Sequence, residues 1–417
     1  MSKNVILACF NLFLWYNILA SIGILTYINF VLKGICVIFM RLKDLKLKNF
    51  RNYKEAYLEF SPNINIFIGE NGSGKTNILE AIYILSLTKS ARFGTDNDLI
   101  MLGENNLSIE GNVQYDDFSK NFIIEIDKFS KRVYKNKNQI KKISEYLSDL
   151  CITSFLPNDI EIIKGSPSLR RNELNIGIGI LYNQYLDYLN EYNRLLKIRN
   201  EYLKRLNING FSDSKYLEII NSKMIELSIK IYYFRFLYLK EINNIISNIY
   251  KKLTGIDTLK VIYDSSLGIK EYDENLIRNT MQKKYKNNLY KEMMQGMTLT
   301  GIHRDDLIFQ INGIDSKIFA SQGQQRLIVI AYKIAELLVF KKIKNEYPIL
   351  LLDDVFSEID IKKRNKIIKY LKNDIQVIIT TTDLEDIDND LVKSSKIFKI
   401  KNGEIKIKGG AKCKKKK

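Results

Sequence analysis

Apolar residues recur along this chain with the periods of both strands and helices. Ile64–Ile68 is a short, mainly apolar run, and Ile349–Leu352 is a second run without any polar interruption. A continuous apolar run is typical of a parallel strand that is covered on both faces. Ile78, Ile82 and Leu85 recur at helical spacing soon after the first run. The pattern predicts an α/β protein with a buried parallel sheet.

The centre of the chain has a helical pattern throughout. No proline and only one glycine, Gly210, occur between residues 180 and 254. A helical stripe precedes this glycine and comprises Tyr185, Leu189, Tyr192, Leu196 and Leu203, interrupted by Arg199. A second helical run covers about 215–252, and Ser212 and Asp213 mark a turn between the two. We therefore expect an antiparallel pair of helices that stands out from the rest of the protein.

The first forty residues differ from the remainder. No charged residue occurs from Asn4 to Leu32, and this length exceeds the ~20 apolar residues that span a bilayer. One interpretation is a transmembrane helix. The other is that translation begins at Met40, where the sequence becomes amphipathic and a complete domain start follows. We favour the second interpretation, so a membrane is an expected partner only if residues 1–39 are translated.

The net charge points to an anionic partner. The chain has 65 basic and 47 acidic residues, a formal charge of +18. Five lysines in the last seven residues, with Lys3 and Lys33, account for part of this charge and leave the body at +11. A basic body favours binding to nucleic acid or to a membrane surface, without choosing between them.

Cysteine and histidine are scarce. The four cysteines form no C-x-x-C pair, and His303 is the only histidine. These counts argue against a zinc site or a disulfide framework. A reduced, cytoplasmic setting is expected.

A phosphate-binding pattern follows the first predicted strand. In the pattern G-x-x-x-x-G-K-[ST], backbone N–H groups wrap nucleotide phosphates at the N-terminus of a helix, and glycines allow the close approach. Lys75 is expected to reach the β- and γ-phosphates, and the Thr76 hydroxyl to bind Mg²⁺. The residues of the pattern are Gly69, Glu70, Asn71, Gly72, Ser73, Gly74, Lys75 and Thr76.

Two carboxylates end the second apolar run. A P-loop needs a carboxylate for its metal, and Asp353 and Asp354 follow Leu352 directly. We expect Asp353 to hold Mg²⁺ through water, and Asp354 to orient or deprotonate the attacking water. Asp353 lies 278 residues after Lys75, so a large insertion must separate the two halves of the site.

The run Ser321–Gln325 lies between these halves and opens a predicted helix. Taken alone, it could be a Ser/Gly helix cap. In this position it resembles the signature motif of ABC ATPases, in the form found in the RecF family and its SMC-like relatives. The resemblance implies that the signature of one subunit closes over the nucleotide of the other. Ser321, Gly323 and Gln324 are then expected to bind the nucleotide across a dimer interface.

Further blocks extend the resemblance to the RecF family from Met40 to about Ile405. Lys46–Tyr53 resembles the N-terminal segment of RecF family sequences, and this resemblance implies that Arg51 lies near the nucleotide. Gln114 is a weak candidate for the Q-loop, and Ile302 departs from the usual proline, which leaves the role of His303 open. The other matching blocks are Lys89–Arg92, Gly301–Leu307, a D-loop at Ser357–Asp360, and Val377–Thr382, which has threonine at the switch position.

The resemblance implies an α/β fold, an ABC-type P-loop ATPase head with an inserted, mainly helical arm. We expect head segments at 40–165 and 296–405, the arm at 166–295, the apolar extension at 1–39 and a basic tail at 406–417. A helix of ~40 residues reaches only ~60 Å, which is too short for the coiled-coil arms of the SMC and RecN families.

For function, the resemblance implies ATP and Mg²⁺ as cofactors and slow, DNA-stimulated hydrolysis that times release from DNA. The expected partners are duplex DNA and single-/double-strand junctions, a second copy in an ATP-dependent homodimer, and RecR and RecO, with which RecA is loaded at gapped DNA. One rival is a transport ATPase, but the chain has only one possible membrane span. Another is a small-molecule kinase, which needs neither a signature nor a D-loop.

Overall fold

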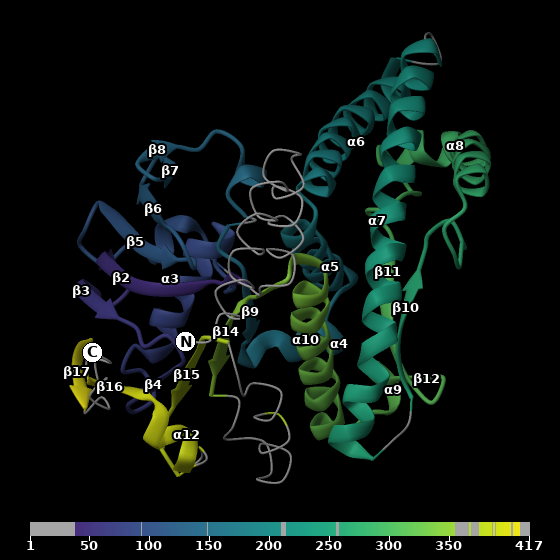
Figure 1. The fold of residues 1–417 in the computed structure, drawn as a ribbon. Helices are drawn as coiled ribbons and strands as arrows, with labels where there is room; N and C mark the ends of the chain where they lie inside the picture. Colours follow the sequence, from purple (N-terminus) through teal and green to yellow (C-terminus); the bar gives the residue numbers. More distant parts are fainter. Residues whose placement is uncertain are drawn as a thin grey trace, which may run out of the picture.

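The structure is a computed structural model in which a head and an arm of long helices lie side by side (Figure 1). Strands and helices of various lengths make up the head, and the long helices α6 (Asn183–Asn209) and α7 (Ser214–Thr254) make up most of the arm. The residues described are 38–92, 94–147, 149–209, 214–255, 258–354, 367, 375–385, 387, 389–401 and 403–408.

The predicted apolar runs form the centre of a mostly parallel sheet. Its strand order is β17-β16-β4-β15-β14-β9, and only the edge strand β17 runs antiparallel to its neighbour. The carboxyl ends of the central strands therefore meet at one edge of the sheet. The strands are β4 (Ile64–Ile68), β9 (Ile152–Phe155), β14 (Ile349–Asp353), β15 (Val377–Thr381), β16 (Lys396–Lys401) and β17 (Glu404–Lys408). The predicted strands at 64–68 and 349–352 are confirmed.

A second sheet is antiparallel, in the order β3-β2-β5-β6-β7-β8. Helix α3 (Lys75–Leu87) contacts strands of both sheets. Most of its side chains are buried, as expected of a helix that is apolar on nearly every side. The strands are β2 (Arg41–Phe50), β3 (Tyr53–Glu59), β5 (Asn106–Gln114), β6 (Ser119–Asp127), β7 (Lys131–Lys135) and β8 (Asn138–Gln139).

The arm contains two long helices, as the sequence predicts. Helix α7 (Ser214–Thr254) has 41 residues, a length of about 60 Å. It contacts the shorter α6 (Asn183–Asn209) and continues along α10 (Gln322–Lys344), so it also anchors the arm to the head (Figure 1). The predicted turn at Ser212 and Asp213 lies outside the described residues.

A small sheet connects the arm with the segment that follows it. Its order is β10-β11-β12, and β10 (Leu259–Asp264) pairs antiparallel with β11 (Asp306–Ile311). This pairing crosses the boundary expected near residue 295, because β10 needs a partner that the chain supplies only after α8 (Glu274–Gln295). The division into domains remains a prediction.

The remaining elements are short or serve as connections. They are β1 (Ile38–Phe39), paired in parallel with β13 (Glu346–Tyr347), β12 (Ile314–Asp315), η1 (Asp96–Leu99), η2 (Ile143–Glu145), η3 (Pro157–Ile160), α4 (Glu161–Lys164), α5 (Pro167–Leu181), α9 (Ser316–Phe319) and α12 (Asn389–Ser394). No helix in the described part of the chain is both long enough and apolar enough to cross a membrane. The apolar segment Asn4–Leu32 lies outside that part.

Arg199, which interrupts the apolar stripe of α6, is fully buried. Its guanidinium pairs with the buried Glu292 carboxylate at 2.7 Å and donates further hydrogen bonds to Asn221 and Thr298. A buried charge is tolerated when it is paired and its donors are satisfied. The interruption in the stripe therefore marks a polar contact inside the arm, between α6, α7 and α8.

His303 lies close to this polar cluster. Its Nε2 is 3.1 Å from the Thr298 carbonyl oxygen, and its Nδ1 is 2.8 Å from the Tyr192 hydroxyl. Because a carbonyl only accepts, Nε2 carries the proton and Nδ1 accepts from Tyr192. The pKa of His303 is lowered to about 4, first by burial and then by the nearby positive charges of Arg304, Arg171 and Arg199, while the hydrogen bond to the Thr298 carbonyl acts in the opposite direction. These contacts give His303 a structural role in the turn before β11.

This neutral histidine should make stability depend on pH. Below the ordinary pKa of 6.5 the unfolded chain binds a proton at His303 that the folded chain takes up only near pH 4. Its contribution to the free energy of unfolding is therefore lost as pH falls from about 6.5 to 4, in total about 3 kcal/mol. Urea unfolding of wild type and His303→Gln should show their stability difference shrinking by this amount between pH 7 and pH 4. A difference that is constant over this range would contradict the assignment.

Candidate phosphate-binding site

The loop at 69–74 connects β4 to α3, and two of its glycines are required by the atoms around them. Gly74 has φ +112, and a Cβ there would lie 2.6 Å from Asn52 Nδ2 and 2.7 Å from the Tyr53 hydroxyl oxygen. A Cβ on Gly69 would lie 2.4 Å from the Ile400 carbonyl oxygen. The Tyr53 hydroxyl also donates to the Gly74 carbonyl at 3.0 Å. The turn between β2 and β3 therefore supports the loop, and both glycines are fixed by close approach.

Lys75 begins α3, and its ammonium folds back over the loop. Its Nζ donates to the carbonyl oxygens of Gly69, at 2.5 Å, and Glu70, at 2.9 Å. Burial lowers the pKa of Lys75, and the negative charges of Asp354 and Asp353 act in the opposite direction. The two carboxylates expected from the sequence thus lie near the lysine.

A hydrogen bond joins the two halves of the predicted site. The Thr76 hydroxyl donates to Asp353 Oδ1 at 3.1 Å, and the Thr380 hydroxyl donates to the same oxygen at 2.6 Å. Sheet register explains the arrangement, because Asp353 lies opposite Thr380 on β15, and Thr380 lies opposite Phe67 on β4. Sequence reasoning placed a threonine at the end of β15 without identifying Thr380 as the residue in contact, since this depends on strand register.

Asp354 follows Asp353 where the chain leaves β14. Its φ is +52, a left-handed conformation that aspartate and asparagine adopt more readily than most residues. Its backbone N–H donates to the Thr380 hydroxyl oxygen at 3.1 Å. Thr380 therefore holds the Asp353 side chain and the Asp354 backbone together.

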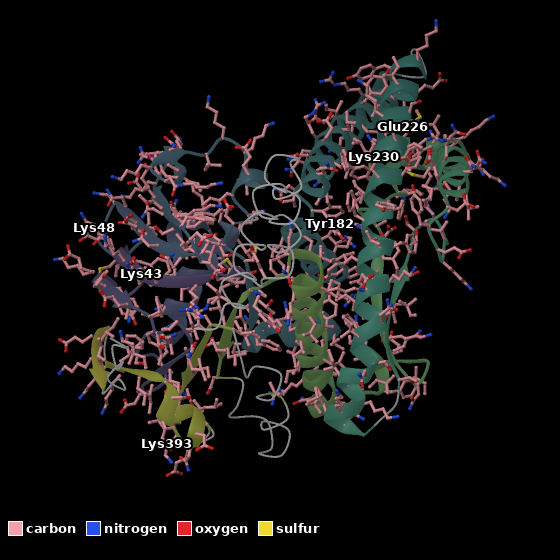
Figure 2. All side chains as sticks on the ribbon, viewed as in Figure 1. Lys43, Lys48, Tyr182, Glu226, Lys230 and Lys393 are labelled. Carbon is pink, nitrogen blue, oxygen red and sulfur yellow. The ribbon has the colours of Figure 1, made fainter. Side chains whose placement is uncertain are left out.

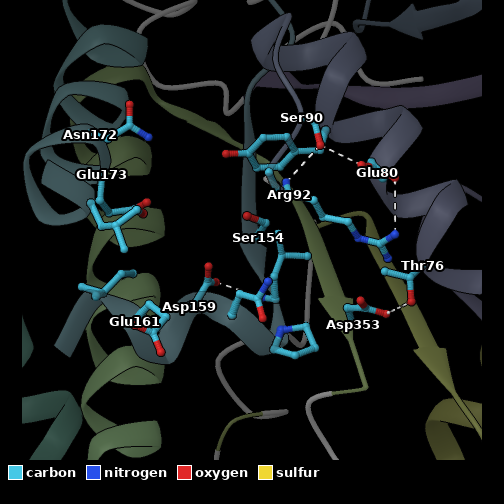
Figure 3. A pocket seen from close by; sticks show the side chains of 17 residues that line it. Thr76, Glu80, Ser90, Arg92, Ser154, Asp159, Glu161, Asn172, Glu173 and Asp353 are labelled. Carbon is cyan, nitrogen blue, oxygen red and sulfur yellow. Dashed lines mark hydrogen bonds and ion pairs between the residues drawn. The ribbon is translucent and has the colours of Figure 1, made fainter. Parts of the chain in front are cut away.

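Two neighbouring cavities open beside this cluster. One has a volume of about 280 Å³, and its lining includes Lys75, Thr76, Asp353 and Asp354, with Asn71, Gly72, Gly74, Asn77, Arg92 and Pro157. The other, of about 330 Å³, shares Thr76, Arg92, Pro157 and Asp353 with the first and continues towards α5 (Figure 3). The cavities lie where β14 and β4 end, the edge at which open α/β sheets bind ligands.

Sequence reasoning missed two groups of residues that line these cavities. Pro157 and Asn158 follow β9, a strand that pairs in parallel with β14 and so ends at the same edge. Arg92 lines both cavities, whereas the sequence indicates it only as part of a block that matches the family. The short apolar run of β9 was a usable signal for the first group. The position of Arg92 depends on how the chain turns after α3.

The signature residues cap a helix and lie away from both cavities. Ser321 is the N-cap of α10, its Oγ accepts from the Gln324 N–H at 3.3 Å, and Gln324 Oε1 accepts from the Ser321 N–H at 2.9 Å. Ser321 and Gly323 are exposed, Gln324 is partly buried, and none of the three lines either cavity. Within one chain, these residues therefore act as a helix cap. The fold of a single chain does not bring the signature next to the P-loop.

Other candidates from the sequence have different surroundings. Arg51 donates through Nε and Nη2 to the Glu80 carboxylate, at 3.1 and 2.9 Å, and it does not line the two cavities. Gln114 lies at the end of β5 and donates to the carbonyl oxygens of Tyr115 and Phe118. The D-loop at Ser357–Asp360 lies outside the described residues.

Comparison with known proteins decides the family. The RecF/RecN/SMC N terminal domain matches residues 41–406. The DNA replication and repair protein RecF of Staphylococcus carnosus is 37% identical over 368 residues, which cover 88% of this chain and 100% of the relative. That of Lactobacillus johnsonii is 37% identical over 374 residues, with the same coverage. This chain belongs to the RecF family.

Solved structures agree with this family and fold. A recombination mediator protein RecF, described with ATP in the RecFOR pathway, has a TM-score of 0.83 and 34% identity, and covers 89% of this chain and 98% of its own. An Smc head with an extended coiled coil, from Pyrococcus furiosus, has a TM-score of 0.52 at 18% identity, which indicates a shared fold alone. The RecF resemblance and the α/β ATPase head are confirmed.

Proposed function

We propose that this member of the RecF family binds ATP with Mg²⁺ in the cavity formed by the P-loop and the end of β14. We also propose that it acts in DNA replication and repair. The observation that carries the proposal is the hydrogen bond between Thr76 and Asp353, residues that are 277 positions apart in the chain and meet next to Lys75. A hydroxyl and a carboxylate at this place are the ligands that P-loop NTPases offer to magnesium.

The surroundings of the loop fit a nucleotide's phosphates. The buried Ser73 hydroxyl has no hydrogen-bond partner in the described structure, and a phosphate oxygen would supply one. Gly72 has φ +78 with open space where a Cβ would stand, so its backbone is free to face a ligand. When bound, Mg²⁺ would neutralise charge on the β- and γ-phosphates.

Each chain residue would then have a distinct task. Lys75 would exchange its carbonyl acceptors for phosphate oxygens, which form stronger charge-assisted hydrogen bonds. Asp353, held by Thr380, would bind the metal through water. Asp354 would orient the attacking water. Since aspartate is one methylene shorter than glutamate, we propose slow hydrolysis.

A second copy would complete the site. A Cβ on Gly323 would meet nothing within 4 Å, and Gly323 does not have a left-handed φ. No contact within the described part of the chain therefore requires glycine at this position. A nucleotide held on a second subunit would approach Gly323 closely, and this approach would explain why glycine stands there. We propose an ATP-dependent homodimer in which the signature acts across the interface, with Arg51 near the nucleotide while it stays paired with Glu80.

The proposed partners beyond ATP follow from the family and from charge. Exposed lysines such as Lys43, Lys48 and Lys393 lie on the outer surface of the head (Figure 2). Phosphate contacts from such residues would give salt-sensitive binding to duplex DNA and to strand junctions. By family resemblance, RecO and RecR would act with this protein to load RecA at gapped DNA, and hydrolysis of ATP would time its release.

The first test is Lys75→Ala. Loss of the ammonium should abolish tight ATP binding, with a fall in affinity of about a hundredfold or more. Calorimetry with ATP and Mg²⁺ measures the dissociation constant, and Lys43→Ala, a change on the outer surface, serves as the matched control. An unchanged dissociation constant in Lys75→Ala would exclude this cavity as the ATP site.

The second test is Ser321→Arg. Each monomer should bind ATP nearly as well as wild type, because Ser321 lies outside the cavity of its own chain. Dimerisation with ATP and hydrolysis should both fail, since the bulky charge stands where two subunits close. Ser321→Asp keeps a good N-cap, and it should also fail to dimerise because its charge repels phosphate. Light scattering that reports a normal dimer for both variants would overturn the interface.

The third test is Asp354→Asn, a substitution that suits the left-handed backbone. This variant should bind ATP and dimerise on DNA, yet hydrolyse ATP more slowly than wild type and remain longer on DNA. A catalytic group displaced by ~1 Å can cost about a hundredfold in rate. Asp353→Asn should instead fail earlier, through loss of the Mg²⁺ ligand. The measurement is single-turnover hydrolysis beside dimer lifetime on duplex DNA, and a wild-type rate in Asp354→Asn would refute the role of Asp354.

A further inference from the structure

Two groups of large apolar side chains are exposed on the head and beside the signature. The first, the signature patch, consists of Ile314, Ile318 and Phe319, of which Ile318 is 72% and Phe319 73% exposed. The second, the hairpin patch, consists of Leu102, which is 100% exposed, and Phe129, which is 97% exposed. Single exposed apolar residues are common on soluble proteins, whereas grouped ones mark sites of contact with a partner. Both patches therefore need an explanation.

The signature patch lies directly before the signature residues. Ile318 and Phe319 belong to α9, which contacts β12, and β12 begins at Ile314. Only Ala320 separates Phe319 from Ser321, the N-cap of α10. Two residues span at most ~7 Å of chain. Whatever covers the N-terminus of α10 would therefore also lie close to the exposed ring of Phe319.

The two residues of the hairpin patch belong to the same end of the antiparallel sheet. Asn106, at the start of β5, lies opposite Asp127, at the end of β6. Leu102 precedes Asn106 by four residues, and Phe129 follows Asp127 by two, in the turn before β7. Because neighbouring strands are about 5 Å apart, the register brings both side chains to one edge of the sheet.

Hydrogen bonds join this edge to the P-loop. The Arg51 backbone N–H donates to the Leu99 carbonyl oxygen at 2.8 Å. Asn52, the next residue, donates through Nδ2 to the carbonyl oxygen of Ser73 in the P-loop, at 3.3 Å. The segment that ends in Leu102 is therefore held beside the turn that supports the P-loop. One patch thus adjoins the signature, and the other adjoins the P-loop.

We propose that in the dimer the signature patch of one subunit packs on the hairpin patch of the other. The inference rests on the proposed homodimer and adds the apolar contacts that would hold it closed. If each signature covers the P-loop of the other subunit, two-fold symmetry forms the contact between the patches twice. Five side chains per subunit are far fewer than the about 20–30 residues of a stable interface. The patches would therefore strengthen a dimer that the nucleotide brings together, without forming one alone.

The test compares Phe319→Ser, Phe129→Ser and the variant with both changes. Sedimentation with ATP and Mg²⁺ measures the dissociation constant of the dimer, which each single change should raise about ten- to a hundredfold. Because the two rings would contact each other, the double change should cost much less than the product of the two single effects. Calorimetry should show nearly unchanged ATP affinity in dilute, monomeric protein, since neither residue lines the two cavities.

A matched control and the variant Ser321→Arg separate this inference from the proposed function. Tyr290 of α8 is also 73% exposed but belongs to neither patch, so Tyr290→Ser should dimerise like wild type. If the effects of the two single changes simply multiply in the double variant, the two rings do not contact each other and the pairing is wrong. If both single variants dimerise like wild type while Ser321→Arg does not, this inference alone fails. If the wild-type protein stays monomeric with ATP and Mg²⁺, the proposed homodimer fails as well.

Discussion

The hydrogen bond between Thr76 and Asp353 depends on the parallel register of three neighbouring strands. β4 delivers the P-loop, β14 delivers the carboxylate, and β15 lies between them and contributes Thr380. Because all three strands run in the same direction, their carboxyl ends meet at one edge, whatever length of chain separates them. The arm can therefore be inserted between the two halves without altering the distance from Thr76 to Asp353. A shift of β14 by one residue would turn Asp353 to the other face of the sheet, away from Thr76, and the site would be lost.

Helix α3 couples this edge to the stability of the head. Its first residues belong to the phosphate-binding loop, and its later residues pack between the parallel and the antiparallel sheet. Residues such as Leu79 and Ile82 are fully buried there. A helix fixed on two sides cannot rotate without opening the core. The ammonium of Lys75 and the carboxylate of Glu80 thus keep a fixed relation to the cavity.

Much of this arrangement can be predicted from the sequence, and the missing parts share a physical cause. The runs at 64–68 and 349–352 are mainly apolar, and the loop between β4 and α3 has a fixed spacing, so the local pattern is enough to find them. The contact of Thr380 with Asp353 depends on sheet register, and the pairing of Arg92 with Glu80 depends on the path of the chain after α3. Neither of these two contacts produces a periodic pattern in the sequence.

Arg199 is a second case in which the sequence pattern alone does not predict a tertiary contact. In the sequence it is a charged interruption of an apolar stripe, which usually indicates a residue that faces solvent. In the structure it is completely buried, because Glu292 of α8 and Thr298 supply partners from almost a hundred positions further along the chain. Pattern alone locates the helix, whereas burial of a charge depends on partners that only the tertiary fold brings near.

Contacts within a single chain explain some of the glycines near the site and leave one of them unexplained. Gly69 and Gly74 are required by their own surroundings, since a Cβ at either would collide with neighbouring atoms. Gly72 is accounted for by its positive φ. Gly323 has neither constraint in the described part of the chain, although it lies in the first turn of α10, where glycine weakens a helix. When a glycine lowers the stability of a helix and no contact within the chain requires it, a contact from outside the chain is the alternative explanation. For Gly323 that reason would be a close approach from outside the chain, at the helix terminus where backbone N–H groups favour an anion.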